Sequence, residues 1–436
     1  MQCSWKVKVF TNKGETAWSE SQRFGIGLLK ECHWSGRWIG LERLMPGEQR
    51  GQYTRLAARY VRSEFKLDKP VKRAIAYVAG IGLHELHVNG KTFDREALVP
   101  MPTDYRKTVL YNTYDITSSL AGENCIGVVL GNGRLFPMRQ NKPYKTPIFG
   151  LPKCRINILI TFTDGTTKRI STDERWKVTA DGPIRSNNEY DGEEYDARKE
   201  LTGWDQVGYD DKTWLQAERS EIPQGTLRAQ MAPGMAMAPF TPEPTTINSK
   251  IYDFHQNMAG WIAFTPTGKP GDTIRVKYAE KLNPDGSLYL DNFRDARSED
   301  IYICGESGVE WHPIFSYHGF RYAQITGPVK DVHAYNVSDN IRATGRFECS
   351  DTVLNKVMHN ARSRGNETRC GSRTRPSTDR TWRLSRRPRR AAPCRGRQEP
   401  FPSSGRSPSG TPPRATDRRP RRPSCTGFRR GCASTR

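Results

Sequence analysis

The stretch AIAYVAGIGLHELHVNGKTF, residues 74–93, carries the clearest secondary-structure signal in this chain. AIAYVAG leads into LHELHVNGKTF, in which apolar and polar residues alternate with the period of two that a half-buried strand requires. Asn89-Gly90 interrupts the alternation, and this dipeptide between alternating segments is the strongest short-range signal for a hairpin with a type I′ turn. The stretch therefore predicts antiparallel strands joined by a tight turn.

Short alternating segments of the same kind continue in both directions from this hairpin. They are WKVKVF (5–10), ENCIGVVLGNG (123–133), CRINILITFTDGTTKRIST (154–172, with a turn at Asp164-Gly165), RWKVTA (175–180) and a second block over 251–337. Helical periodicity is almost absent from residues 1–327. We therefore predict an all-β fold of tandem β-sandwich or jelly-roll domains.

Two passages depart from this pattern. The Pro- and Met-rich AQMAPGMAMAPFTPEPTT, residues 229–246, is typical of a linker. At Ser350 the period changes, because Ser350 or Asp351 can cap a helix that places several apolar residues on one face. The residues of that face are Val353, Leu354, Val357, Met358 and Ala361.

The charge of the chain is concentrated at its C-terminal end. The whole chain carries +22, but residues 361–436 hold 22 Arg, no Lys and four acidic residues, a net charge of +18. With ten Pro and one Leu, this segment has too little apolar surface to offset its ordering entropy, so we expect disorder. A basic arm that binds phosphates is one interpretation. We favour an out-of-frame translation product, and we expect no specific nucleic-acid partner.

Other classes of protein have little support in the sequence. The cysteines before residue 361 are scattered without a CxxC pair, so neither a zinc site nor a disulfide framework is indicated. MQCSWKVKVF enters an alternating segment at once, and we expect no signal peptide. No apolar run approaches the roughly 18 residues that span a membrane, so no membrane partner is expected. These features do not assign a compartment.

The densest group of carboxylates and tyrosines is NNEYDGEEYD, residues 187–196. In a strand, Asp191, Glu193 and Tyr195 share one face. Aromatic rings with carboxylates and amides suit sugar hydroxyls, whereas a solvated edge with an Asp196–Arg198 ion pair is the alternative. The candidate carbohydrate-binding residues are Asn187, Asn188, Glu189, Tyr190, Asp191, Glu193, Tyr195 and Asp196. No cofactor is required for such binding; the oxygens of this segment could also ligate calcium, with Asn188 and Asp191 as candidate ligands.

Other motifs have structural interpretations. GNGR, residues 131–134, is typical of a turn. Trp204, Trp214 and Trp261 are expected to be buried. In YHGFRY, residues 317–322, we expect packing aromatics, with His318 and Arg321 as candidate domain-interface residues.

Seven segments in order resemble the non-catalytic part of bacterial α-L-rhamnosidases. They are AWSE with WIG (17–20 and 38–40), DYRKTVLYNTYDIT (104–117), LGNGR (130–134), YDGEEYDAR (190–198), QNMAGW (256–261), YHGFRY (317–322) and GRFECSDTVLNKVMHNAR (345–362). The resemblance implies five parts. These are a fibronectin type III-like remnant (1–29), a jelly-roll domain similar to rhamnose-binding modules (30–240), a second β-sandwich (241–345), the start of a truncated helical (α/α)₆ barrel (346–362) and the tail (363–436).

The resemblance also implies a function. An inverting glycoside hydrolase of this family removes terminal α-L-rhamnose and needs two carboxyl groups that face one bond. The family's acidic motif after the first barrel helix has no counterpart here, since RCGSRTRPSTDR does not match it. We therefore expect no catalytic residue in this chain and no activity of the chain alone. The alternative is a module that binds rhamnose-containing glycosides or polysaccharides without hydrolysis.

Overall fold

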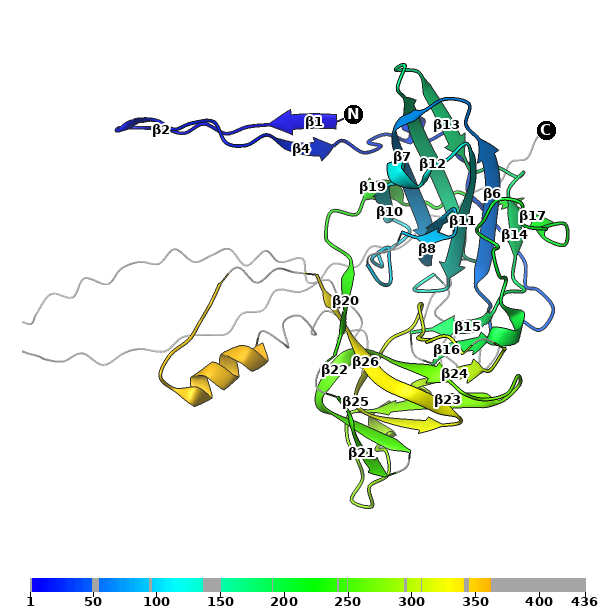
Figure 1. Cartoon of the computed structure of the whole chain (residues 1–436), viewed down its shortest axis with the longest axis vertical. Helices are drawn as coiled ribbons and strands as arrows, with labels where there is room; N and C mark the ends of the chain where they lie inside the picture. Colours follow the sequence, from blue (N-terminus) through cyan, green and yellow to red (C-terminus); the bar gives the residue numbers. More distant parts are fainter. Residues whose placement is uncertain are drawn as a thin grey trace, which may run out of the picture. The chain divides into compact units, whose positions relative to one another are not determined.

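The computed structural model describes residues 2–48, 55–93, 96–135, 150–189, 191–240, 243–248, 250–293, 296–306, 308–340 and 345–361. Within these ranges the chain is built almost wholly of strands, and the all-β prediction is confirmed (Figure 1). The predicted tail, residues 363–436, lies outside the described residues.

The first domain is a sandwich of two mainly antiparallel sheets. One sheet has the order β18-β5-β12-β7-β10-β19, with β13 beside β12, and its strands are β18 (Glu218–Arg219), β5 (Ile39–Gly40), β12 (Lys153–Phe162), β7 (Val71–Ile81), β10 (Thr108–Asp115), β19 (Thr226–Ala229) and β13 (Thr167–Ser171). The other has the order β17-β14-β6-β11-β8-β9, with β17 (Leu215–Gln216), β14 (Lys177–Thr179), β6 (Arg59–Lys66), β11 (Glu123–Gly131), β8 (Leu83–Val88) and β9 (Lys91–Thr92). Alternate residues of β7, β12, β6 and β11, including Val78, Ile156, Val61 and Val128, fill a common core between the sheets.

The opening stretch forms the predicted elements. Ala74 to Ile81 lie in β7, and β8 pairs with β9 across Asn89-Gly90, with Val88 opposite Lys91. Asn89 has φ 52° and Gly90 has φ 79°, the two positive values that a type I′ turn requires. The turn at Asp164-Gly165 likewise joins β12 to β13. Both hairpin predictions are confirmed.

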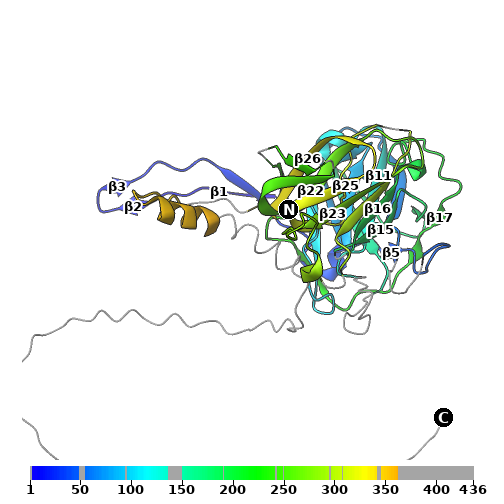
Figure 2. The same cartoon turned by 90° about the horizontal axis from the view of Figure 1, so that it is seen from below.

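The second domain is one large sheet. Its order is β15-β16-β24-β23-β25-β22-β26-β20, with β21 beside β22, and Figure 2 labels β22, β23 and β25 close together, where β25 lies between the other two. The strands are β15 (Ile184–Asn188), β16 (Gly192–Asp196), β24 (Glu299–Ile303), β23 (Thr273–Ala279), β25 (His318–Thr326), β22 (Ile251–Pro266), β26 (Val329–Asp339), β20 (Met235–Pro239) and β21 (Thr245–Asn248). One face buries an aromatic core around Phe254, Phe264, Tyr278 and Phe320.

The hairpin β15–β16 belongs to this second sheet, although its partner strand β24 begins at Glu299, far beyond the end of β16 at Asp196. β16 pairs in parallel with β24, with Glu194 opposite Ile301. Gly192, at φ 92°, lies so close to β24 that a Cβ there would be 2.0 Å from the carbonyl oxygen of Glu299. Only glycine fits this combination of positive φ and close approach.

A buried carboxylate, Asp300, fastens the hairpin to the sheet. Its Oδ1 accepts a hydrogen bond from the backbone N–H of Glu193 at 2.8 Å and one from the Ser316 hydroxyl at 3.1 Å. Its Oδ2 accepts from the Tyr278 hydroxyl at 2.6 Å, and His318 Nε2 lies 3.1 Å from both oxygens. Burial opposes ionisation, but His318 and Tyr278 outweigh it and lower the pKa of Asp300.

The linker prediction for residues 229–246 is wrong in part. Residues 235–239 form β20, which pairs with β26 at the edge of the second sheet, with Met237 opposite Val337. An edge strand tolerates proline because one side of it needs no ladder hydrogen bonds, and Pro239 is the last residue of β20.

The remaining elements are short. Two small antiparallel ladders join β1 (Gln2–Trp5) to β4 (Gln22–Gly25) and β2 (Phe10–Thr11) to β3 (Gly14–Glu15). Four 3₁₀ turns occur within the described ranges: η1 (Glu31–His33), η2 (Thr117–Ser119), η3 (Ala197–Lys199) and η4 (Asp291–Phe293). A helix occupies residues 352–361, capped by Asp351, whose Oδ1 accepts from the backbone N–H of Val353 at 2.7 Å. The predicted helix start is therefore confirmed.

The Asp300 cluster yields a stability prediction. We expect Asp300→Ala to lower the free energy of unfolding by at least about 3 kcal/mol, because it leaves buried partners without their acceptor. Asp285→Ala is the control, since Asp285 accepts from Ser287 N in a turn and its carboxyl is exposed; its cost should stay near or below about 1 kcal/mol. Urea unfolding measures both, and equal costs would contradict a central role for Asp300.

Candidate functional site

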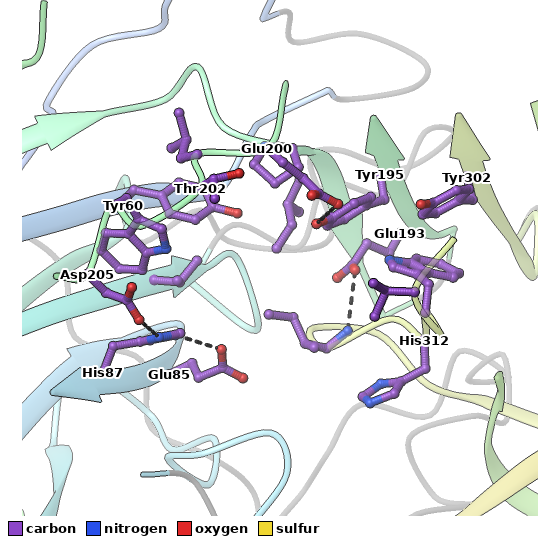
Figure 3. Close-up of a pocket in the computed structure, with 18 of the residues that line it drawn as sticks. Tyr60, Glu85, His87, Glu193, Tyr195, Glu200, Thr202, Asp205, Tyr302 and His312 are labelled. Carbon is purple, nitrogen blue, oxygen red and sulfur yellow. Dashed lines mark hydrogen bonds and ion pairs between the residues drawn. The ribbon is translucent and has the colours of Figure 1, made fainter. Parts of the chain in front are cut away.

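A cleft of about 510 Å³ opens where the first sandwich meets the hairpin β15–β16 and the loop before β25 (Figure 3). Its lining comes from β6, β8, β11, β15, β16 and β24 together with residues 200–205 and 309–314. The lining residues that carry rings or polar groups are Tyr60, Glu85, His87, Glu193, Tyr195, Glu200, Thr202, Trp204, Asp205, Tyr302, Glu310, Trp311 and His312.

One side of the cleft is built by the first sandwich. Tyr60 and Trp204 pack edge to face with ring centroids 5.2 Å apart, and His87 lies 5.0 Å from the Trp204 ring. In Figure 3 the labelled residues Tyr60, Asp205, His87 and Glu85 lie together on the left side of the view. Period two along β8 places Glu85 and His87 on the same face of that strand.

The imidazole of His87 is held between two carboxylates. Nδ1 lies 2.8 Å from Asp205 Oδ2, and Nε2 lies 2.9 Å from Glu85 Oε1. Burial lowers the pKa of His87, but the hydrogen bonds to Asp205 and Glu85 outweigh it and raise the pKa to about 9. His87 is therefore an imidazolium at neutral pH, and both of its N–H groups are already used.

The opposite side is an aromatic cluster from the second domain. Tyr195 stacks on Tyr302 with an interplanar angle of 3° and a centroid distance of 5.6 Å. Trp311 lies 5.8 Å from Tyr195 and 5.2 Å from Tyr302. The Tyr195 hydroxyl donates to Glu200 Oε1 at 3.3 Å. Rings with adjacent hydrogen-bonding groups suit the apolar faces and the hydroxyls of a sugar.

Glu193 lies between the two sides with 2% of its surface exposed. Its oxygens accept hydrogen bonds from the backbone N–H groups of Ile314 (3.3 Å) and Phe315 (3.0 Å). Burial is the main cause that raises the pKa of Glu193 to about 8, against the lowering effect of those two amides. Glu193 thus ties β16 to the loop that carries Trp311 and His312.

The predicted carbohydrate-binding residues separate into two groups. Glu193 and Tyr195 line the cleft. Asn187 and Asn188 are buried, and Asn187 Oδ1 accepts from the backbone N–H of Asn132 at 2.7 Å. Glu189 forms an ion pair with Arg134 at 2.9 Å.

The last members of the predicted group have local partners. Asp191 Oδ1 accepts from the backbone N–H of Arg297 at 3.3 Å. Asp196 caps η3 and pairs with Arg198 at 2.9 Å, which is the ion pair considered as the alternative. Tyr190 lies outside the described residues. Among the described residues no group of three or more His, Cys, Asp or Glu could hold a metal ion, and calcium at Asn188 and Asp191 stays a prediction.

The candidate domain-interface residues lie in different environments. His318 is 3% exposed and belongs to the Asp300 cluster. Arg321 keeps 38% of its side chain exposed and forms a two-pronged ion pair with Asp253, at 2.7 and 2.8 Å. No helix in the described ranges has the length and apolar character that crossing a bilayer requires.

Several cleft residues were not predicted from the sequence. Trp204 was expected to be buried, and it is, at 8% exposure, but it also lines the cleft. Glu85, His87, Tyr302 and Trp311 come from segments far apart in the chain. The alternation in LHELHV places Glu85 and His87 on one strand face, and this is the only local signal for these four residues.

The fold consists of two β-domains in tandem, and comparisons with known proteins agree with this class. Residues 69–239 match the family model for the α-L-rhamnosidase N-terminal domain. Residues 245–343 match the model for the bacterial α-L-rhamnosidase concanavalin-like domain. The chain therefore belongs to the bacterial α-L-rhamnosidase family through these two domains.

Individual relatives support the same assignment. An α-L-rhamnosidase of Formosa agariphila is 36% identical over 394 residues, which cover 82% of this chain and 41% of the relative. The solved α-L-rhamnosidase from Dictyoglumus thermophilum is 34% identical, with a TM-score of 0.74 over 84% of this chain and 42% of that chain. An α-L-rhamnosidase from Streptomyces avermitilis, solved in complex with L-rhamnose, is 28% identical, with a TM-score of 0.65 over 83% of this chain and 37% of that chain. The chain spans about two fifths of the length of these relatives.

The raised pKa of Glu193 yields a pH prediction. The folded state holds this proton more tightly than the unfolded chain, whose pKa is 4.5, so the associated stability is present below pH 4.5 and is lost as the pH rises through about 8. Glu193→Gln cannot ionise and keeps an acceptor toward Phe315. We expect its free energy of unfolding to fall less steeply than that of the wild type between about pH 5 and about pH 9.

The raised pKa of His87 also causes a loss of stability as the pH rises from 6.5 through about 9. This loss is common to the wild type and the variant, so it cancels in their comparison. Glu123→Gln, at an exposed position that pairs with Lys66, is the control and should keep the wild-type slope. Equal slopes for the wild type and Glu193→Gln would contradict the buried titration.

Proposed function

We propose that the β-domains of this chain bind rhamnose-containing glycosides or polysaccharides in the cleft between Trp204 and Trp311, without hydrolysing them by themselves. The single observation that carries this proposal is the pairing of two aromatic clusters on opposite sides of a 510 Å³ cleft lined with hydrogen-bonding groups. A cleft of this size accommodates one or two sugar rings.

The chemistry of the lining favours sugar over other ligands. The Trp204, Tyr195 and Trp311 rings offer flat apolar surface. The carboxylates of Glu85 and Glu200 each keep an oxygen that accepts no hydrogen bond from any described residue. Such oxygens suit sugar hydroxyls, which are donors. Family membership and the L-rhamnose complex of the Streptomyces avermitilis relative support rhamnose as the sugar.

Hydrolysis by the cleft itself is disfavoured by the environment of Glu193. A glycosidase needs a protonated carboxyl that reaches the leaving-group oxygen and a second carboxylate on the other side of the bond. Glu193 is the lining carboxyl whose pKa is raised, to about 8, yet both of its oxygens face the backbone N–H groups of Ile314 and Phe315. Its role is therefore to position the loop, not to protonate a substrate.

The binding proposal predicts a measurable affinity for methyl α-L-rhamnoside. One sugar ring offers few atoms, so calorimetry should give a Kd between about ten micromolar and a few millimolar. The double variant Glu200→Ala/Tyr195→Phe removes an open acceptor and a hydroxyl from the cleft, and we expect at least about tenfold weaker binding with a nearly unchanged melting temperature.

Two comparisons locate the binding. Glu123→Ala, outside the cleft, is the matched control and should bind as the wild type does. The double variant Asn188→Ala/Asp191→Ala, titrated with and without a chelator, tests the predicted calcium-dependent location. Loss of affinity only in this variant, or only with chelator, would move the sugar away from the cleft. No heat with any rhamnoside at tens of millimolar would overturn the proposal.

The purified chain should leave p-nitrophenyl α-L-rhamnoside uncleaved. General acid–base catalysis alone supplies about 10²–10⁴-fold of a glycosidase's rate, and the cleft presents no carboxyl poised for it. Release of p-nitrophenol is followed by absorbance. Turnover that co-purifies with the chain and falls in Glu193→Gln would show that the cleft is catalytic.

A further inference from the structure

We infer that this cleft selects neutral sugars and excludes uronic acids. The inference rests on the proposed function and deepens it, because it concerns which glycans the same cleft takes. It is supported by the charges that line the cleft and by the hydrogen bonds that already engage the guanidinium groups beside it.

The lining carries acids without basic side chains other than imidazoles. Of the described residues, no lysine or arginine lines the cleft. The carboxyl-bearing residues are Glu85, Glu193, Glu200, Asp205 and Glu310. Among the described residues, a ligand carboxylate in this space therefore meets the carboxylates of Glu85, Asp205, Glu200 and Glu310 and no guanidinium or ammonium group.

The imidazolium of His87 does not offset these acids. Both nitrogens of His87 are bonded to Asp205 and Glu85, so neither N–H is open to a ligand. His312 bonds through Nδ1 to the carbonyl oxygen of Pro313 at 3.0 Å and stacks on Trp261 at 5.2 Å. The cluster of His87 with its two carboxylates carries a net negative charge, because one imidazolium faces two acids.

The arginines beside the cleft are also engaged elsewhere. Arg62 donates from Nε to the carbonyl oxygen of Trp204 at 2.7 Å and forms ion pairs with Asp211 and Glu64. Arg185 donates from Nη1 to the carbonyl oxygens of Ala180 (3.0 Å) and Gly182 (2.9 Å). Moving either guanidinium to a ligand would break hydrogen bonds that buried or half-buried groups need.

The consequences for a ligand follow from its C6 group. L-Rhamnose has a methyl group at C6, which can pack on the apolar lining of Leu201, Val309 or Ile314. The corresponding uronic acid places a carboxylate at the same position. That carboxylate must lose its water shell next to other negative charges, and the cleft screens their repulsion weakly. The hydroxyl groups that both sugars share meet the same acceptors in the cleft. Any difference in affinity should therefore come from the C6 group alone.

The test compares three ligands that differ only at C6. They are methyl α-L-rhamnoside, methyl α-L-mannoside and the sodium salt of methyl α-L-mannosiduronic acid, titrated calorimetrically into the full chain at about 20 mM and about 200 mM NaCl. We expect the uronate to bind at least about tenfold more weakly than the rhamnoside at low salt. The difference in affinity between the uronate and the rhamnoside should decrease at high salt. The mannoside controls for the size of the C6 group.

Charge-neutralising variants test the cause. Glu200→Gln and Glu310→Gln each remove one negative charge from the cleft, and we expect each to raise the affinity for the uronate relative to that for the rhamnoside by about threefold or more. Glu123→Gln carries the same substitution outside the cleft and should leave this ratio unchanged. The ratio is informative even where a variant changes the affinity for both sugars.

Each outcome has one meaning. Rhamnoside binding with a weak, salt-sensitive uronate supports the inference. Equal affinities for rhamnoside and uronate, or a ratio that Glu200→Gln and Glu310→Gln leave unchanged, overturn the inference and leave the proposed function intact. Binding of none of the three ligands overturns the proposed function, and the inference falls with it.

Discussion

The arrangement of the second domain depends on the buried carboxylate of Asp300. It is 0% exposed and accepts from three other strands or loops, through Tyr278, Ser316 and the backbone of Glu193. Desolvating a carboxylate is expensive, and the expense is offset only when the surrounding donors are complete. His318, 3.1 Å from both oxygens, completes the set. One charged group thus holds together elements that are more than a hundred residues apart in sequence.

The shape of the cleft depends on the hydrogen bonds that Asp300 accepts. Once the Glu193 backbone is bound to Asp300, the Glu193 side chain points toward the backbone N–H groups of Ile314 and Phe315 and fixes the loop that bears Trp311. Tyr195, two residues further along β16, then stacks on Tyr302 of β24. The aromatic side of the cleft is therefore assembled by the same hairpin register that the carboxylate sets, which couples the stability of the sheet to the shape of the site.

The sequence predicts those features of the fold and the cleft whose interacting residues lie close together in the chain. The hairpin at Asn89-Gly90 and the Asp351 cap were predicted because their signals lie within a few residues. The parallel pairing of β16 with β24 was not, because parallel strands are joined by long crossovers and no local pattern encodes their partner. The segment 187–196 was recognised as important from its carboxylates and tyrosines, but of its described residues only Glu193 and Tyr195 line the cleft. Other described residues of the segment are held by contacts such as that of Asn187 with Asn132, which the sequence could not reveal.

The net charge of the chain likewise does not predict the charge of the cleft. The chain carries +22, yet its most distinctive cavity is lined by carboxylates, with no lysine or arginine among the described residues there. The net charge of a chain describes its long-range field, which salt screens beyond about 8 Å, whereas a ligand in a cleft responds to the groups within a few ångströms. Arg62 and Arg185 lie beside this cleft, but their guanidinium groups donate hydrogen bonds to backbone carbonyls. They therefore stabilise the backbone around the cleft and do not reach a ligand in it. Under the proposed function, the sugar that the cleft accepts depends on which cations the fold has already engaged, and this is a property of the folded structure that composition does not contain.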